Sequence, residues 1–202
     1  MTSYGMLLFD DAEELDFVGP WEVFAVSEMV LARAGEPPAG HLVTIAEELR
    51  PVRCAKGLRV EVDHALADAP AVDVVLVPGG RGTRREQDNP AILAWLKDRA
   101  GSAQWMTSVC TGSLLLVRSG VAHGRRVATH WSFEDTFEGL GLATVVRDAR
   151  WVRDGQVVTS QGVSAGIDMA LWLVGQLHGR DHARAVQRHI QYDPAPPYQA
   201  EV

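Results

Sequence analysis

Short runs of consecutive apolar residues alternate along this chain with longer segments in which apolar residues recur at helical spacing. The apolar runs are typical of buried strands, and we predict strands over residues 4–9, 41–46, 72–77, 104–109 and 126–129. The longer segments predict helices over residues 16–35, 90–100, 114–117, 132–140, 165–177 and 181–191. Shorter β segments are expected at residues 52–54, 58–62, 145–147, 151–153 and 157–159. This alternation predicts an α/β fold, with a mostly parallel sheet covered by helices on both faces.

Two of these helices carry recognisable signals at their ends. Asn89 is a good N-cap residue and Pro90 suits a first helical position, so a helix is expected to begin there. Pro20 suits the first turn of the helix that we predict from Asp16, and Gly35 can end that helix. The chain shows no internal repeat and no long linker, so we predict one domain over residues 1–202.

Composition narrows the class of protein. Hydrophobic residues make up 47% of the 202 residues, the net charge is -7, and the Lys and Arg residues form no basic stripe, which argues against a nucleic-acid partner. The first nine residues do not read as a signal peptide, and no apolar stretch is long enough to span a membrane. With only Cys54 and Cys110, we expect a cytoplasmic protein with free thiols, in which Cys54 is a packing residue.

The residues that could carry chemistry lie where predicted strands end. Ligands of parallel sheets collect at the carboxyl ends of the strands. Asp16 follows the first strand, Gly79 and Gly80 follow the strand at residues 72–77, and Cys110 follows the strand at residues 104–109. We therefore expect these residues to lie close together.

Cys110 is the candidate nucleophile. Its sulfur would lie near a helix N-terminus, where free N–H groups and the helix dipole favour the thiolate. The small residues Thr111, Gly112 and Ser113 allow the sharp strand-to-helix turn known as a nucleophile elbow. The alternative is a buried structural cysteine.

Asp16 and the glycines have two interpretations each. Asp16 is either an N-cap or a carboxyl group beside Cys110, and burial next to a thiolate would raise its pKa so that it holds a proton near neutral pH. The amides of Gly80 and Thr111 are candidate donors to developing negative charge, although Gly79-Gly80 could form a simple turn. No glycine-rich stretch matches a phosphate-binding or dinucleotide motif.

His130 is a candidate for the rim of the same site. It follows a predicted strand end, and the alternative is a partly exposed residue at a helix start beside a packed Trp131. The seven histidines are scattered, and no Cys/His spacing resembles a zinc site, so we expect no metal.

Several motifs together carry a family resemblance. The segments LLFDDAEELDFVGPWEVF, VPGG, TSVCTGSLLL, THW, GVSAGIDMAL and YDPAPPY occur in this order. The chain thereby resembles the ThiJ/PfpI superfamily, and within it the branch that hydrates isonitriles (isocyanides). Asp16, where many members have Glu, and Thr111, where the protease-like branch has His, follow the hydratase pattern. Val163 and Ser164 depart from the Ile-Thr of that branch, which affects the expected shape of the substrate pocket.

The resemblance implies a fold, a reaction and an assembly. The fold would be a flavodoxin-like sandwich, similar to class I glutamine amidotransferases, in a homodimer with the active site near the interface. The reaction would convert an isonitrile and water into an N-substituted formamide without a cofactor. Cys110 would form a thioimidate, and Asp16 would act as proton donor and base. A glyoxalase- or deglycase-like enzyme and a non-enzymatic thiol-based sensor or ligand-binding protein are the alternatives.

Overall fold

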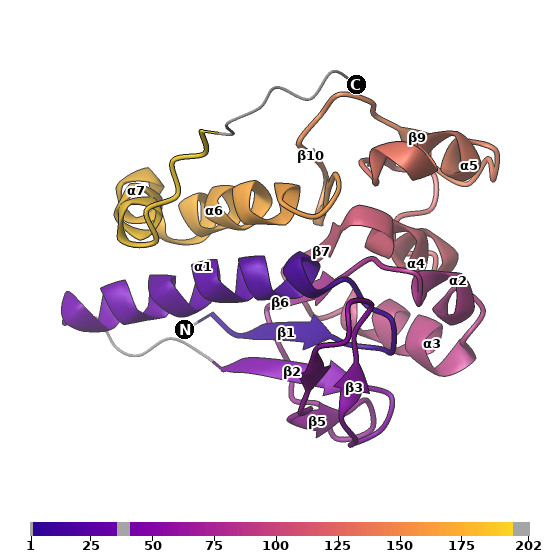
Figure 1. Ribbon diagram of the computed structural model, residues 1–202, viewed down its shortest axis with the longest axis horizontal. Helices are drawn as coiled ribbons and strands as arrows, with labels where there is room; N and C mark the ends of the chain where they lie inside the picture. Colours follow the sequence, from indigo (N-terminus) through magenta and orange to yellow (C-terminus); the bar gives the residue numbers. More distant parts are fainter. Residues whose placement is uncertain (1, 36–40, 196–202) are drawn as a thin grey trace.

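The computed structural model describes residues 2–35 and 41–195, and its centre is a seven-stranded sheet (Figure 1). The strand order is β10-β11-β7-β6-β1-β2-β5. The strands are β1 (Tyr4–Leu7), β2 (Leu42–Ala46), β5 (His64–Ala65), β6 (Val74–Val77), β7 (Trp105–Val109), β10 (Trp151–Asp154) and β11 (Val157–Ser160). All neighbours pair in parallel except β10 and β11, which are antiparallel. The predicted mostly parallel sheet is confirmed.

Helices cover both faces of the sheet because side chains alternate along each strand. Trp105 and Val109 of β7 pack into one apolar cluster, with Phe24 and Leu173, whereas Met106 packs into the other, with Leu115. The first cluster lies under α1 (Glu14–Arg33), α6 (Ala165–His178) and α7 (Arg180–His189), which lie together in Figure 1. The second cluster includes side chains of α3 (Pro90–Arg99), α4 (Ser113–Arg118) and α5 (Glu134–Glu138).

Two small sheets and two single turns of 3-10 helix complete the described elements. Strands β3 (Val52–Arg53) and β4 (Arg59–Val60) form an antiparallel hairpin, and β8 (Arg126–Val127) pairs in parallel with β9 (Thr144–Val145). The 3-10 turns are η1 (Cys110–Gly112) and η2 (Trp131–Phe133). No described helix combines the length and apolar character needed to cross a membrane.

Most predicted elements are found, and the differences have physical reasons. Helix α1 begins at Glu14 rather than at Asp16, because Glu13 takes the extended N-cap conformation. Pro20 therefore lies inside the helix, not in its first turn, and cannot donate to the Asp16 carbonyl. Asn89 does cap α3, since its side chain accepts the Ala91 N–H at 3.0 Å. Strand β5 and helix α2 (Thr83–Glu86) were not predicted, being too short to show a period, and residues 196–198 of the YDPAPPY segment lie outside the described residues.

Candidate active site

Cys110 lies at the carboxyl end of β7 with a backbone φ of +57°, a left-handed conformation that is strained for any residue except glycine. Three hydrogen bonds hold this elbow. The Cys110 N–H donates to the Gln161 carbonyl at 3.1 Å. The Cys110 carbonyl accepts the hydroxyls of Ser113 at 3.2 Å and Thr129 at 3.1 Å. The sharp strand-to-helix turn predicted at Cys110 is therefore present, and hydrogen bonds to Gln161 and Thr129 support it from outside the turn.

Glycine is required where the elbow meets the loop after β6. A Cβ on Gly112 would lie 2.2 Å from the Val77 carbonyl oxygen, and a Cβ on Gly79 would lie 2.6 Å from the Thr111 nitrogen. Both distances are far inside van der Waals contact, so any side chain at either position would push the two strand ends apart. The glycines after β6 and β7 thus allow the loop and the Cys110 turn to lie close together.

Asp16 is fully buried in the first turn of α1, next to Cys110. Its Oδ2 accepts the Gly79 N–H at 2.8 Å, and the Cys110 thiol lies close enough to lower its pKa. Its other oxygen, Oδ1, is buried and has no hydrogen-bond partner among the described residues. The Asp16 side chain forms no N-cap hydrogen bond, because Glu13 occupies that position. Burial raises the pKa of Asp16 to about 7, although the bond from Gly79 opposes the shift. Gly79 thereby positions the carboxyl group beside Cys110.

The pKa of Cys110 does not follow the sequence-based expectation of a readily formed thiolate. Burial, followed by the negative charge of Asp16, raises it to about 12. The Thr111 N–H and hydroxyl and the Val163 N–H act in the opposite direction, because they stabilise a charged sulfur. The negative charge of Asp16 disfavours a charged sulfur, whereas the contact with the Cys110 thiol stabilises the Asp16 carboxylate. Above about pH 7 the two groups therefore hold one proton between them and titrate as a pair.

Thr111 is the centre of a hydrogen-bond network at the floor of the pocket. Its Oγ1 accepts the Gly80 N–H at 3.2 Å and Arg84 Nη1 at 3.2 Å, and lies 3.1 Å from the Thr83 hydroxyl. The Gly80 amide is therefore bonded to Thr111 rather than open to a ligand. Arg84 and Thr83 were not expected at the site from the sequence. The available signal was the basic run RGTRR directly after the VPGG loop.

The pocket in front of Cys110 has a volume of about 500 Å³. Five predicted site residues line it: Gly80, Cys110, Thr111, His130 and Val163. The Val163 backbone has a φ of +48°, and its N–H interacts with the Cys110 sulfur, a role that the sequence did not reveal. The other lining residues are Asp11, Glu13, Ala55, Lys56, Arg81, Arg84 and Ser132.

His130 is held at the pocket by its neighbours. Its Nδ1 accepts the Ser132 N–H at 3.2 Å, and a Cβ on Gly162 would lie 2.4 Å from the imidazole ring. Burial and the charge of Arg84 lower the pKa of His130, which favours the neutral ring at pH 7. Trp131 is 66% exposed, so the expectation that it packs in the interior is wrong. Cys54 is buried, as expected of a packing residue.

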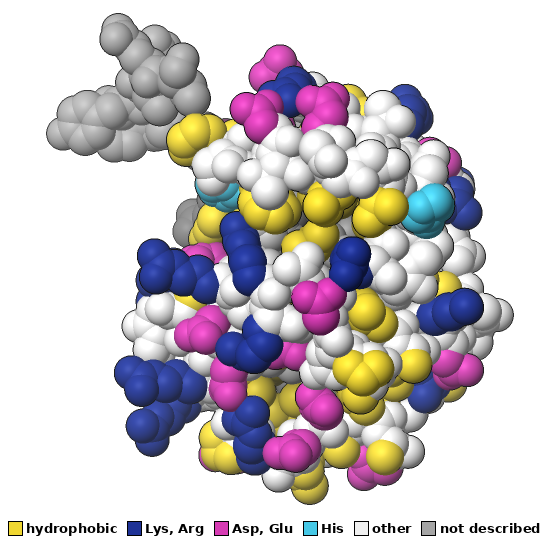
Figure 2. Space-filling model, turned by 90° about the vertical axis from the view of Figure 1, so that its right-hand side faces the viewer, with side chains coloured by type: hydrophobic (Ala, Val, Ile, Leu, Met, Phe, Trp, Pro, Cys, Tyr) yellow, Lys and Arg dark blue, Asp and Glu magenta, His cyan; other side chains and the backbone are white. Residues whose placement is uncertain are grey.

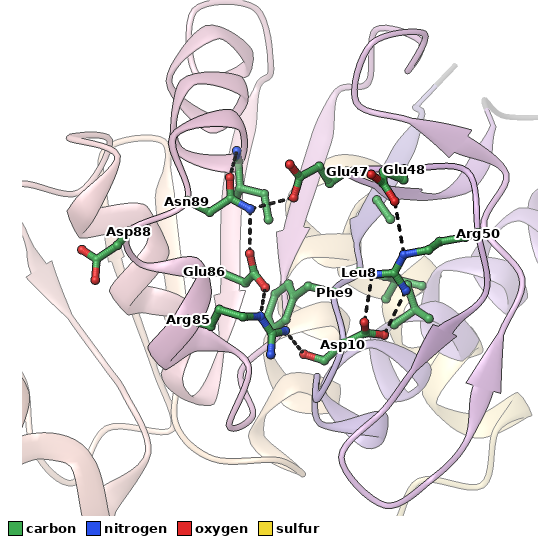
Figure 3. A pocket seen from close by; sticks show the side chains of 13 residues that line it. Leu8, Phe9, Asp10, Glu47, Glu48, Arg50, Arg85, Glu86, Asp88 and Asn89 are labelled. Carbon is green, nitrogen blue, oxygen red and sulfur yellow. Dashed lines mark hydrogen bonds and ion pairs between the residues drawn. The ribbon is translucent and has the colours of Figure 1, made fainter.

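A second pocket, of about 340 Å³, lies between the ends of β1 and β2 and the α2–α3 segment (Figure 3). Its charged side chains point toward one another and are paired, as in Arg50 with Asp10 at 2.8 Å and Arg85 with Glu86 at 2.7 Å. Arg85 also donates to the Asp10 carbonyl at 2.8 Å, which ties α2 to the end of β1, and no cysteine or histidine lines this pocket. Among the described residues, no group of three or more His, Cys, Asp or Glu side chains is arranged to hold a metal ion.

Comparison with known proteins agrees with the fold. Residues 4–176 match the DJ-1/PfpI family. The chain is 40% identical over 194 residues to the isonitrile hydratase of Pseudomonas putida, which covers 96% of this chain and 80% of that protein. It is 28% identical over 183 residues to a glutathione-independent glyoxalase of Caenorhabditis elegans, covering 90% of this chain and 91% of that protein.

A solved structure leads to the same assignment. A ThiJ/PfpI family protein from Pseudomonas syringae superimposes with a TM-score of 0.87 at 31% identity, covering 100% of this chain and 79% of that one. The chain therefore belongs to the DJ-1/PfpI family and has its flavodoxin-like fold. The resemblance found in the sequence motifs is confirmed, whereas the homodimer stays a prediction because the structure contains one chain.

Proposed function

We propose that this protein is an isonitrile hydratase, which converts an isonitrile and water into an N-substituted formamide. The observation that carries the proposal is the buried Asp16 carboxyl group beside Cys110, with the pKa of Asp16 raised to about 7. The 40% identity to the hydratase of Pseudomonas putida supports the choice of reaction. The chemistry needs both a soft nucleophile and a proton source at one carbon atom, and this pair supplies both.

The first step forms a carbon–sulfur bond. The terminal carbon of R–NC is electrophilic toward sulfur, and attack by Cys110 leaves the electron pair on that same carbon. Asp16 supplies the proton that the carbon takes up, which gives the thioimidate R–N=CH–S–Cys110. Because charge develops on carbon and not on a carbonyl oxygen, the proton donor matters more in this step than an oxyanion hole.

The second step adds water and releases the thiol. Asp16, now a carboxylate, takes a proton from water as the oxygen bonds to the thioimidate carbon and passes this proton to the nitrogen. The tetrahedral R–NH–CH(OH)–S–Cys110 then breaks its carbon–sulfur bond, which yields R–NH–CHO and returns one proton to the Asp16–Cys110 pair. The N–H groups of Thr111 and Val163 stabilise the departing sulfur.

The test is direct detection of the product. Incubation of the protein with cyclohexyl isocyanide is expected to produce N-cyclohexylformamide, followed by the formyl proton signal in NMR. Methylglyoxal is assayed in parallel, because the family includes a glyoxalase. Conversion of methylglyoxal to lactate without any formamide from the isonitrile would overturn the proposal.

The pH dependence of kcat/KM follows from the shared proton. Below pH 7 both Asp16 and Cys110 are protonated, so no thiolate forms, and one proton leaves the pair near pH 7. We therefore expect kcat/KM to rise about tenfold per pH unit up to about pH 7 and to stay level above it. A stopped assay between pH 5 and pH 9 measures this, and a profile that falls above pH 7 would contradict the shared-proton assignment.

A further inference from the structure

Unpaired positive charge remains at the mouth of the Cys110 pocket. On the end of the molecule toward which β1 points, Lys and Arg side chains lie among Asp and Glu side chains (Figure 2). Lys56 pairs with Glu13, and Asp11 lies 3.4 Å from Arg85. The two remaining cations of this pocket, Arg81 and Arg84, have no carboxylate within 4.0 Å in the part of the chain that the structure describes. This is notable in a chain with a net charge of -7.

Arg84 is held in place without being neutralised. Its Nη1 donates to the Gly80 carbonyl at 2.9 Å and to the hydroxyls of Thr83 at 3.1 Å and Thr111 at 3.2 Å. The guanidinium carbon lies 4.5 Å from the centre of the Phe133 ring. These partners are neutral, so they fix the orientation of the side chain and leave its charge available. A guanidinium that is already ordered loses less freedom when it binds an anion.

The charge of Arg84 acts on the residues that line the pocket. The leading influences on the pKa of Cys110 are burial, Asp16 and the donors of Thr111 and Val163. Arg84 does lower the pKa of His130, and both side chains line the pocket, so the charge of Arg84 acts on the surroundings of the space that a substrate would fill. Because Arg84 bonds to Thr111, the residue after the nucleophile, this charge is close to the reacting carbon.

We propose that the pocket selects isonitriles that carry a carboxylate a short distance from the isonitrile group, and that Arg84 binds this carboxylate. This inference rests on the proposed function and names its substrate class. A guanidinium recognises the planar carboxylate through two parallel N–H donors. Arg81 adds positive potential at the mouth. The short path from Arg84 through Thr111 to Cys110 favours a spacer of one or two carbons.

The test compares two substrates that differ in charge. Wild-type kcat/KM is measured with isocyanoacetate and with its neutral methyl ester, and we expect isocyanoacetate to be preferred by about tenfold or more. In Arg84→Met the preference is expected to fall to about one or below. The ratio is the readout, because loss of the bond to Thr111 would reduce both rates together. Arg84→Lys should keep part of the preference, and Arg184→Met, on the exposed side of α7, should keep all of it.

A binding measurement separates this inference from the proposed function. Calorimetry with N-formylglycine and with N-formylglycine methyl ester needs no turnover, and only N-formylglycine should bind more weakly to Arg84→Met. Equal wild-type kcat/KM for the two isonitriles would overturn the inference and leave the hydratase assignment intact. If no isonitrile yields a formamide but N-formylglycine still binds through Arg84, the proposed reaction is wrong and the carboxylate-binding role of Arg84 stands. If the Arg84→Met variant still prefers isocyanoacetate over its methyl ester, Arg84 is not the residue that binds the carboxylate.

Discussion

In the Cys110→Ser variant, formamide production from an isonitrile is expected to fall by about 10³-fold or more. The hydroxyl keeps the size and the hydrogen-bond contacts of the thiol, but it is a harder and much weaker nucleophile toward the isonitrile carbon. The structure offers no substitute, because Cys54, the other cysteine, is buried and does not line the Cys110 pocket. Turnover is followed by NMR, and circular dichroism checks that the variant folds.

The matched control is Cys54→Ala. It removes the second thiol, which lies outside the pocket, and kcat/KM is expected to stay within about twofold of wild type. Intact-mass measurement after incubation with the isonitrile should show no adduct on Cys110→Ser. If Cys110→Ser hydrates the isonitrile at the wild-type rate, sulfur is not the nucleophile and the mechanism is wrong.

The Asp16→Asn variant is expected to separate nucleophile reactivity from turnover. Removal of the carboxylate takes away a negative charge that raises the pKa of Cys110, so the pKa of the thiol falls and alkylation by iodoacetamide at pH 7 becomes faster. Asn cannot donate the proton to carbon or accept one from water. Turnover is therefore expected to drop by about 10²-fold or more, and a thioimidate adduct of substrate mass should accumulate on Cys110.

The same variant has a predicted effect on stability. Unfolded Asp16 loses its proton near pH 3.8, whereas the folded group keeps it until about pH 7. Stability is thus lost as the pH rises from about 4 to 7, and the full cost, on the order of 4 kcal/mol, is present at pH 8. Asp16→Asn should raise Tm at pH 8 by roughly 5 °C or more and should have little effect near pH 4.

Glu22→Gln is the matched control for both effects. Glu22 is an exposed carboxylate on the same helix, away from Cys110. Its replacement should leave the alkylation rate, the turnover and the difference in Tm between pH 4 and pH 8 unchanged. Slower alkylation and a lower Tm at pH 8 in Asp16→Asn would show that Asp16 stabilises the thiolate. That result would contradict the effect of the Asp16 charge, which raises the pKa of Cys110.

Local sequence signals were sufficient to predict most of the helices and strands. The run VDVVLV predicts a buried strand because only a strand between two helical layers accepts apolar side chains on both faces, and β6 is such a strand. Asn89 and Pro90 mark the start of α3 because capping depends on neighbouring backbone groups. The start of α1 was misplaced, since the conformation of Glu13 depends on the loop after β6: its N–H donates to the Gly79 carbonyl at 3.0 Å.

The sequence alone was enough to find the candidate residues and to place them at strand ends, because parallel topology brings those ends together. Their electrostatics and their hydrogen-bond partners depend on the folded structure. The direction in which the pKa of Cys110 shifts depends on how completely the thiol is buried and on the charge of Asp16, which is 94 positions earlier in the chain. Likewise, the contacts of Arg84 with Thr111 and Phe133 join segments that no local pattern links, because hydrogen bonds and charge interactions depend on distance in space.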